Sequence, residues 1–300
     1  MHYVFGLDAG FLMPTGVAIA SLQRFLDPDD VVAALHVGLG DDDVASLRRC
    51  AKDVPLLAID CAPHLHPTWR PAGRLPATAY CRWLAERLLP DADRCVYFDG
   101  DVLVRRNPRT FAETDLDGRT VGAVRSRVAP FLASPGGVKA WFELGLRGAA
   151  PFFNTGVLVM DLAAWRERDV TARLVGFTSD DRDTWVETPV NEAMNAVLCE
   201  DWTEVGREWN YITHVTESFL PAPEDEPADP AVVHFAGTHK PWTCGRLPIY
   251  ADEWYEVLAS TPWVGFRPEP PASPTGLRAG ARRLAGRGLR RLRAAARDLG

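Results

Sequence analysis

Two aspartates with one glycine between them, Asp99 and Asp101, stand directly after an apolar run at residues 95–98. Such a run is typical of a short buried strand. If the extended conformation continues through Gly100, both carboxylates point to the same side, because the side chains of a strand alternate faces. Two like charges so close together are costly unless a cation lies between them. The spacing therefore predicts a divalent-metal site. A simple strand-to-turn junction, where Asp and Gly are also common, is the alternative.

A second group of polar residues follows the apolar run at residues 231–235. His234 lies near the end of this run, with Gly237 and Lys240 just beyond it. Two carboxylates and one imidazole would suit Mn²⁺ or a similar divalent cation, and would leave coordination positions for a diphosphate. Lys240 would neutralise phosphate charge, and Gly237 would let the backbone approach the phosphates closely. The alternative for His234 is a histidine whose hydrogen bonds are satisfied within the core.

Three further candidate residues lie in or near apolar runs. Asp8 follows residues 3–7, and its carboxylate could accept hydrogen bonds from a nucleotide base on which Phe11 stacks. Asn154 stands near the start of the apolar run at residues 152–162. A buried amide needs hydrogen-bond partners, so Asn154 is either a structural bridge or a ligand contact.

Strands and helices are expected to alternate in the first sixty residues. The patterns predict a strand at residues 3–7, a helix at 14–25 with Thr15 as a candidate N-cap, a strand at 31–37, a helix at 41–50 and a strand at 55–59. This order is typical of an α/β fold, in which helices cover a mostly parallel sheet. Ligands of such sheets bind at the carboxyl ends of the strands, where Asp8 and Asp99 both stand.

The remaining apolar patterns extend the same kind of domain. They predict helices at residues 78–89, 138–146, 165–175 and 190–198, and strands at 120–124 and 152–162. We interpret residues 1–261 as one domain, followed by a proline-rich linker at 262–275 and a basic tail at 276–300.

Composition excludes several classes of protein. With 47% hydrophobic and 24% charged residues in 300, the chain is expected to be an ordinary globular protein, and its formal net charge of −7 argues against nucleic acid as the principal partner. Six cysteines without a Cys-x-x-Cys pair indicate neither a zinc ribbon nor a disulfide framework. A secretory signal would begin with lysine or arginine, but none precedes Arg24. No stretch approaches the ~20 apolar residues of a membrane span. We therefore expect a cytoplasmic protein.

The tail at residues 276–300 differs in charge from the rest of the chain. Eight arginines and one aspartate give it a charge of +7, which leaves −14 on the remainder. On a helix, most arginines fall on one face, and the opposite face carries Leu277, Ala281, Leu284, Leu292, Ala295 and Leu299. Such a helix could lie on the inner face of an anionic membrane, which predicts peripheral association. A solvated or disordered basic tail is the alternative, since the glycines at 276, 280, 286 and 288 weaken the helix.

Taken in order, four blocks of residues resemble glycosyltransferase family 8, the retaining family that includes bacterial lipopolysaccharide galactosyl- and glucosyltransferases and glycogenin. The blocks are Phe5-Gly6-Leu7-Asp8 with Phe11; Tyr80-Cys81-Arg82 with residues 97–104; residues 153–158 with residues 161–166; and residues 234–242. They span roughly residues 3–242. Each block is short, but the ordered set is specific.

The resemblance implies a GT-A fold, which is a single Rossmann-like nucleotide-sugar-binding domain. It also implies a manganese ion held by Asp99, Asp101 and His234, and a donor that is a nucleotide diphosphate sugar, usually a UDP-sugar. The implied donor contacts are Asp8 and Phe11 at the base, Asp99, Gly100, Gly237 and Lys240 around the diphosphate, and Arg82 and Asn154 on the donor side of the pocket.

One block departs from the family pattern. The family usually shows Asp-Gln-Asp or Asp-Gln-Gly where this chain has Val190-Asn191-Glu192. Val190 replaces the aspartate that lines the donor sugar, and Asn191 is one methylene shorter than the glutamine near the anomeric carbon. A retaining enzyme needs either a nucleophile opposite the leaving group or a front-side route assisted by the leaving phosphate. We favour the front-side route, with Asn191 and Asn154 as polar stabilisers and Glu192 as a carboxylate that could move in.

The sequence thus predicts a metal-dependent retaining hexosyltransferase. It would move a hexose from UDP-glucose or UDP-galactose to a hydroxyl of a glycan, a glycolipid or a small molecule. A non-catalytic nucleotide-sugar-binding protein of the same fold is the main alternative, and Val190 is its best argument. A phosphatase of the haloacid dehalogenase type also uses Asp-x-Asp, but it expects Thr or Ser where Leu103 stands.

Overall fold

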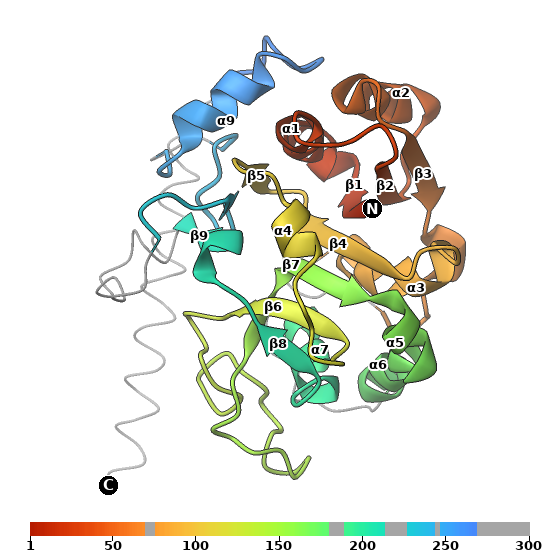
Figure 1. Cartoon of the computed structure of the whole chain (residues 1–300), viewed down its shortest axis with the longest axis vertical. Helices are drawn as coiled ribbons and strands as arrows, with labels where there is room; N and C mark the ends of the chain where they lie inside the picture. Colours follow the sequence, from red (N-terminus) through yellow and green to blue (C-terminus); the bar gives the residue numbers. More distant parts are fainter. Residues whose placement is uncertain (70–75, 180–188, 214–226, 244–246, 269–300) are drawn as a thin grey trace, which may run out of the picture.

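A sheet of seven strands runs through the middle of the molecule (Figure 1). The computed structural model describes residues 1–69, 76–179, 189–213, 227–243 and 247–268. In spatial order the strands are β3 (Leu56–Asp60), β2 (Val31–Val37), β1 (His2–Asp8), β4 (Arg94–Asp99), β7 (Phe153–Asp161), β6 (Val121–Arg125) and β8 (Trp202–Glu204). Within this sheet β7 runs antiparallel to both of its neighbours, and the other paired strands are parallel. The predicted α/β fold with a mostly parallel sheet is therefore confirmed.

Helices cover both faces of this sheet. They are α1 (Leu12–Gln23), α2 (Asp41–Ala51), α3 (Ala85–Leu88), α4 (Arg109–Ala112), α5 (Leu162–Glu167), α6 (Val170–Ser179), α7 (Pro189–Val197) and α9 (Ala251–Leu258), with 3-10 turns η1 (Ala9–Phe11), η2 (Ala62–His64), η3 (Ala77–Leu84) and η4 (Arg207–Trp209). Figure 1 shows α1 and α2 together beside β1–β3, and α5 and α6 together beyond β7.

The alternation of strand side chains explains the three layers. In β1, Tyr3, Phe5 and Leu7 pack into a core with α1, α2 and α4, whereas Val4 packs into a second core with η3, α5, α6 and α7. All four side chains are buried. A strand that is apolar on both faces can be covered only when helices lie on each side, which is why β1 reads as a continuous apolar run.

A second, smaller sheet is formed by β5 (Val102–Val104), β10 (Val232–His234) and β9 (Tyr211–Ile212), in that order. β10 is antiparallel to β5, with His234 opposite Val102, and parallel to β9, with His234 opposite Ile212. This sheet therefore joins three segments that are far apart in sequence, and it does so at the carboxyl end of β4.

The predicted helix at residues 138–146 is wrong. This segment forms successive turns, and the backbone of Gly145 has a φ of +67°, which favours glycine and ends a helical course. Val138 instead packs in a small separate core with Leu132 and Phe152. Phe142 is 75% exposed on the outside of this excursion.

Three other predicted helices differ in detail. Residues 78–89 form the 3-10 turn η3 followed by the short α3, and residues 165–175 are divided between α5 and α6 at Asp169, which has a φ of +50°. Helix α1 begins at Leu12, so Thr15 is a buried helical residue and not an N-cap. Asp8 caps the preceding turn η1 by accepting a hydrogen bond from Gly10 N at 2.9 Å.

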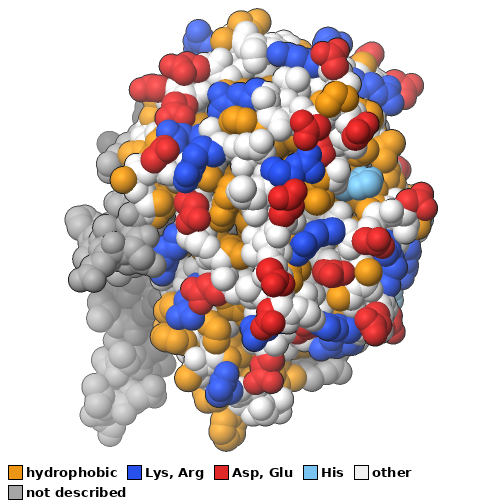
Figure 2. Space-filling view, in the orientation of Figure 1, with side chains coloured by type: hydrophobic (Ala, Val, Ile, Leu, Met, Phe, Trp, Pro, Cys, Tyr) orange, Lys and Arg blue, Asp and Glu red, His pale blue; other side chains and the backbone are white. Residues whose placement is uncertain are grey.

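The packed structure continues beyond α9. Trp263 packs against two of the cores, and a Cβ atom added to Gly16 would come within 2.2 Å of its ring. Residues 269–275 of the predicted linker and the whole predicted tail lie outside the described residues, so the proposed domain boundaries stay predictions. Within the described ranges, no helix has the length and apolarity needed to cross a membrane. Figure 2 shows acidic and basic side chains interspersed over one face of the molecule.

Candidate active site

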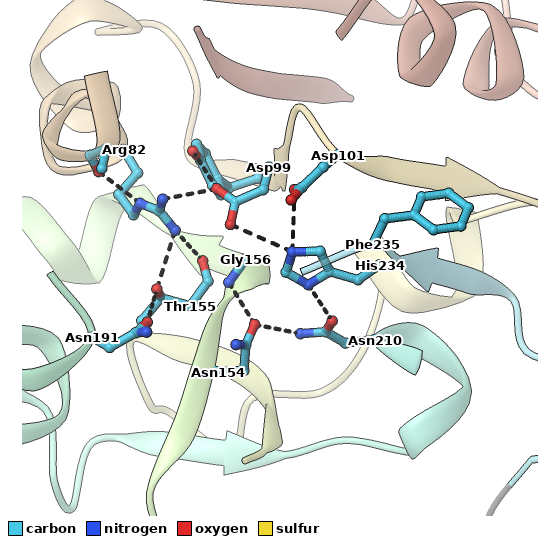
Figure 3. A network of polar contacts seen from close by, with 12 residues as sticks. Arg82, Asp99, Asp101, Asn154, Thr155, Gly156, Asn191, Asn210, His234 and Phe235 are labelled. Atoms are coloured by element: carbon cyan, nitrogen blue, oxygen red, sulfur yellow. Dashed lines mark hydrogen bonds and ion pairs between the residues drawn. The ribbon is translucent and has the colours of Figure 1, made fainter. Parts of the chain in front are cut away.

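Asp99, Asp101 and His234 bring one possible metal-ligand atom each to a common point (Figure 3). These atoms all lie within 4.8 Å of one another. His234 Nε2 is 3.2 Å from Asp101 Oδ1 and 3.8 Å from Asp99 Oδ2. Asp101 and His234 are buried, and Asp99 is partly exposed. The donor set of two carboxylate oxygens and one imidazole nitrogen suits a divalent cation such as Mn²⁺.

The two carboxylates converge through a turn and not through strand alternation. β4 ends at Asp99, Gly100 and Asp101 form a turn, and β5 begins at Val102 in the second sheet. The predicted extended course through Gly100 is therefore wrong, although both carboxylates reach the same point. A Cβ atom on Gly100 would lie 2.2 Å from Thr15 Oγ1. The turn is thus packed directly on α1, where a larger residue would force it away.

The small sheet places His234 against this turn. Because His234 pairs with Val102, its backbone lies beside the residue that follows Asp101. Phe235 N donates a hydrogen bond to Asp101 O at 2.9 Å, which extends the pairing by one step. His234 thus reaches the carboxylates from a strand about 130 residues away in the sequence. The intervening chain is too long to fix this position by itself, so the strand pairing fixes it.

Gly156 of β7 forms the floor of the cluster. A Cβ atom at this position would lie 2.3 Å from His234 Cε1 and 2.6 Å from Asp99 Oδ2. A Cβ atom does not make contacts that short, so the missing side chain keeps the space between His234 and Asp99 open. The residues present therefore fit a divalent cation in both their chemistry and the room that they leave.

Arg82 and Tyr97 fix the other oxygen of Asp99. Arg82 Nη2 donates to Asp99 Oδ1 at 2.8 Å, and Tyr97 OH donates to the same oxygen at 3.0 Å. The Arg82 guanidinium also donates to Thr155 O and, through Nε, to Ala79 O at 2.9 Å. Burial opposes the charge on Arg82, but Asp99 stabilises that charge and its pKa stays above the ordinary arginine value. Asp99 Oδ2 is left facing His234.

Lys240 lies on the far side of Asp101. Its Nζ donates to Asp101 Oδ2 and to Phe235 O, the latter at 2.6 Å. Burial alone would raise the pKa of Asp101, but the charge of Lys240 and the contacts of Lys240 and His234 with its two oxygens hold it well below its usual value. Asp101 is therefore expected to be ionised at neutral pH. Lys240 therefore lies at the cluster, and its predicted contact with a phosphate stays a prediction.

A chain of amides supports His234 from behind. Gly156 N donates to Asn154 Oδ1, Asn210 Nδ2 donates to the same oxygen, and Asn210 Oδ1 lies against His234 Nδ1. Each of these three distances is 2.9 Å. Asn154 thus contacts the ligand histidine through Asn210, which makes it at least a structural bridge.

The predicted donor-sugar residues on α7 fall into three different environments. Asn191 Oδ1 accepts a hydrogen bond from the Thr155 hydroxyl, which places it next to Arg82. Glu192 is buried, and its Oε1 accepts from Lys139 N at 2.7 Å, which anchors the 126–151 excursion. Val190 is 2% exposed within the hydrophobic core. Of the three, Asn191 is the one that the structure connects to the cluster.

The predicted base-binding residues lie at the end of β1. Phe11 touches the Asp-Gly-Asp turn, since a Cβ on Gly100 would come 3.3 Å from its ring, and the Phe11 and Trp242 rings meet edge to face at 6.1 Å. Asp8 Oδ2 accepts from Thr78 Oγ1 at 3.3 Å. Gly237 has a φ of +87°, a conformation that glycine adopts readily.

Four residues of this network were not predicted from the sequence. Tyr97, Thr155 and Gly156 stood in the matched blocks without an assigned role, and Asn210 had no signal beyond being a polar residue beside an apolar pair. They are recognised by their contacts: Tyr97 and Thr155 through Asp99 and Arg82, and Gly156 and Asn210 through His234.

With this geometry established, the relationship to known proteins is clear. Residues 2–244 match the sequence profile described as "Glycosyl transferase family 8". The chain belongs to glycosyl transferase family 8. The resemblance recognised in the sequence is confirmed, and membership of this family supports a function in glycosyl transfer.

Relatives agree with the family and the fold. General stress protein A of Bacillus subtilis is 24% identical, over 88% of this chain and 94% of its own length. Glycosyltransferase GlyF of Streptococcus pneumoniae is 25% identical, and the match covers 64% of this chain and 44% of GlyF.

Solved structures show the same fold. Galactosyltransferase LgtC, in complex with donor and acceptor sugar analogues, superposes with a TM-score of 0.70 at 21% identity, over 90% of this chain and 98% of LgtC. The bifunctional glycosyltransferase WbbM gives a TM-score of 0.75 at 20% identity, over 88% of this chain and 50% of WbbM. The fold of this domain is GT-A.

Proposed function

We propose that this protein is a metal-dependent retaining hexosyltransferase that uses a UDP-sugar, either UDP-glucose or UDP-galactose, as donor. The observation that carries the proposal is the convergence of Asp99, Asp101 and His234 beside Lys240, in a chain of family 8. Three protein ligands leave coordination positions for a diphosphate. The metal and the lysine are the positive charges that such a leaving group requires.

The residues of the cluster have distinct roles in this proposal. Asp99, Asp101 and His234 would hold the divalent cation. The cation would neutralise the charge that develops on the leaving diphosphate. Lys240, already within reach of Asp101, would donate hydrogen bonds to a phosphate oxygen. Gly237, with its left-handed backbone, lets the main chain approach the diphosphate. Charge placement of this kind stabilises the transition state electrostatically.

The sugar end of the site favours a front-side reaction. Asn191 is held by Thr155 next to Arg82, where its amide can stabilise the sugar as positive charge develops at the anomeric carbon. Glu192 is engaged with the backbone of Lys139, so its use as a nucleophile would require that bond to break. In the front-side route the leaving phosphate oxygen accepts the proton of the acceptor hydroxyl, and no protein nucleophile is needed.

The base end completes the donor site in this proposal. Asp8 and Phe11 would receive the uracil, with Phe11 offering a ring face or edge close to Gly100. Arg82 and Asn154 would line the donor pocket. The acceptor is a hydroxyl of a glycan, a glycolipid or a small molecule, and the proposed location is cytoplasmic, with peripheral membrane association through residues 276–300.

A direct experiment tests the proposal. Purified protein is incubated with a panel of UDP-sugars, with Mn²⁺ or with a chelator, and the release of UDP and of free or transferred sugar is measured. Manganese-dependent release supports the enzyme. Asp101→Asn should abolish manganese-dependent donor binding, whereas Asp42→Asn, at an exposed site on α2, should not. Donor binding by the Asp101 variant that still responds to manganese would contradict the metal assignment.

A non-catalytic nucleotide-sugar-binding protein is the second candidate. It is favoured by the burial of Val190, since an apolar core side chain stands at the position expected to line the sugar. Two results together would support this candidate over the enzyme. The protein would bind a UDP-sugar tightly with manganese, and it would neither hydrolyse that sugar without an acceptor nor transfer it in a cell extract.

A further inference from the structure

Asn210 is buried between His234 and the side-chain amide of Asn154. It is 4% exposed, and it lies between η4 and β9, just before the strand that pairs with β10. The preceding residue, Trp209, stacks on Phe111 with ring centroids 5.1 Å apart. Glu208 O accepts a hydrogen bond from Ala231 N at 2.8 Å. The backbone that carries Asn210 is therefore fixed on both sides, and its side chain cannot move far.

The direction of every hydrogen bond in the chain of amides follows from one backbone group. Gly156 N–H can only donate, so the atom of Asn154 that lies 2.9 Å from it must be the carbonyl oxygen. The same oxygen lies 2.9 Å from Asn210, so it must be met there by the amide nitrogen. The reverse orientation of Asn210 would place two carbonyl oxygens against each other.

His234 is therefore met by an acceptor. With its nitrogen turned to Asn154, Asn210 presents Oδ1 to His234 Nδ1 at 2.9 Å. An oxygen at this distance requires that Nδ1 carries a proton. In the neutral imidazole the other nitrogen, Nε2, then has a free lone pair, and Nε2 is the atom that faces Asp99 and Asp101.

We propose that Asn210 is a positioning residue that holds His234 in the Nδ1–H tautomer and so presents the Nε2 lone pair to the metal. The metal itself rests on the proposed function above. Hydrogen bonds of this kind on the far nitrogen of a ligand histidine fix the tautomer and the ring orientation, and their loss typically lowers metal affinity about 10–100-fold.

The first test reads the tautomer directly in metal-free protein. Protein labelled with ¹⁵N in histidine is examined by long-range ¹H–¹⁵N correlation at neutral pH. The signals of His234 are identified by their absence in His234→Gln. Wild-type protein should show a protonated Nδ1, whether or not Nε2, which lies 3.2 Å from Asp101 Oδ1, also carries a proton in the absence of metal. An Nδ1 without a proton in the wild type overturns the proposal without any further variant.

Two substitutions separate orientation from general packing. Asn210→Leu removes the acceptor, so His234 should lose its single tautomer and Mn²⁺ affinity, followed by electron paramagnetic resonance, should fall about 10–100-fold. Asn210→Asp keeps an acceptor at Nδ1 but places an oxygen against Asn154. If the residue acts through the tautomer, Asn210→Asp keeps Nδ1–H and wild-type or tighter Mn²⁺ binding. If it acts only through packing, both variants lose Mn²⁺ affinity in parallel with stability, which overturns the proposal.

Asn195→Ala is the matched control. Asn195 is also a buried amide, which accepts from Phe153 N at 2.7 Å and donates to Phe153 O at 2.9 Å. Its loss should lower the melting temperature and leave the His234 tautomer unchanged.

Failure of this inference differs from failure of the proposed function. An Asn210→Leu protein with the wild-type tautomer and wild-type Mn²⁺ affinity overturns the role of Asn210 and leaves the metal site intact. A wild-type protein with the Nδ1–H tautomer but no Mn²⁺ binding sustains the hydrogen-bond assignment and contradicts the metal-dependent function.

Discussion

Arg82 and Asp99 form an ion pair in which the aspartate uses only one of its oxygens. Arg82 Nη2 donates to Asp99 Oδ1 at 2.8 Å, and the other oxygen faces His234. Arg82 is held in place by further bonds to Thr155 and Ala79, and its charged group lies 4.5 Å from the centre of the Tyr97 ring. The arginine therefore aims a carboxylate that would bind the metal, which is a role beyond its implied contact with the donor.

This pair predicts that Arg82→Lys is not conservative. Lysine keeps the charge but cannot make the same fork of hydrogen bonds, so Asp99 would lose its fixed orientation. We expect a loss of about 1.5–3 kcal/mol in the free energy of unfolding and weaker Mn²⁺ binding, measured by denaturant unfolding and metal titration. Tyr97→Phe removes the other donor to the same oxygen and should cost less, about 0.5–1.5 kcal/mol. Equal Mn²⁺ affinity in Arg82→Lys and wild type would contradict this role.

Gly156→Ala should close the space between the metal ligands. The added Cβ would meet His234 Cε1 and Asp99 Oδ2, so we expect Mn²⁺ affinity to fall about tenfold or more, the order of effect seen when ligands are displaced. Metal titration of the folded variant measures this. Gly176→Ala is the control, because nothing lies within 4 Å of that helical position and alanine there should stabilise by about 0.5–1 kcal/mol. The prediction fails if both variants bind Mn²⁺ as the wild type does.

Val190→Asp should destabilise the fold and not restore a sugar contact. Val190 lies in the core, where an unpaired carboxylate costs about 3–5 kcal/mol. Thermal unfolding should show a fall in Tm on the order of 10 °C, because about 1 kcal/mol corresponds to 2–4 °C in a domain of this size. Val190→Thr, which keeps the shape of the side chain, should lower the Tm less than Val190→Asp does. A well-folded Val190→Asp protein with raised turnover would instead place this side chain beside the sugar.

Asp30 predicts an acid-dependent loss of stability. This carboxylate is buried at 1% exposure and accepts hydrogen bonds from Asp27 N and Arg109 Nη2, each at 2.9 Å. Burial alone would raise its pKa, but the Asp27 bond, the Met1 amino group and Arg109 lower it below the ordinary value. A lowered folded-state pKa stabilises the fold fully above the unfolded-state pKa of about 3.9, and this contribution is lost as the pH falls through the folded-state pKa.

Asp30→Asn is therefore expected to lower the free energy of unfolding by about 1.5–3 kcal/mol at neutral pH. The difference from wild type should narrow below about pH 4, where the wild-type carboxylate also becomes protonated. Urea unfolding across this pH range checks the sign. A difference that is constant from neutral to acid pH would show that the charge of Asp30 does not contribute.

Deletion of residues 276–300 should separate membrane association from catalysis. If the tail lies on anionic lipid, each arginine near the surface contributes about 1 kcal/mol, so the shortened chain should lose most of its sedimentation with phosphatidylglycerol vesicles. Donor hydrolysis should not change, because the cluster and its supports all lie before residue 244. Sedimentation of the shortened chain at the full-length level would show that the tail is not the membrane contact.

Much of the fold could be predicted from local patterns. The apolar runs of β1, β2, β4 and β7 stand out because both of their faces are buried, and strands and helices that alternate dictate a mostly parallel sheet. The helix predicted at 138–146 was wrong because apolar spacing there serves a small core built from turns, in which Gly145 has a positive φ. Local periodicity cannot distinguish an amphipathic helix from such a series of turns, since both place apolar side chains on one side.

The sequence alone determined which chemical groups this protein brings to its site: two carboxylates around a glycine, a histidine and a lysine in the family order. Only the tertiary structure decided how they meet. Asp99 and Asp101 converge through a turn packed on α1, and the pairing of β10 with β5 and β9 brings His234 to them with Asn210 behind it. Residue types and short-range spacing are encoded locally. The direction of a hydrogen bond and the space left by Gly156 depend on strands more than fifty residues apart, and those are set only when the sheets form.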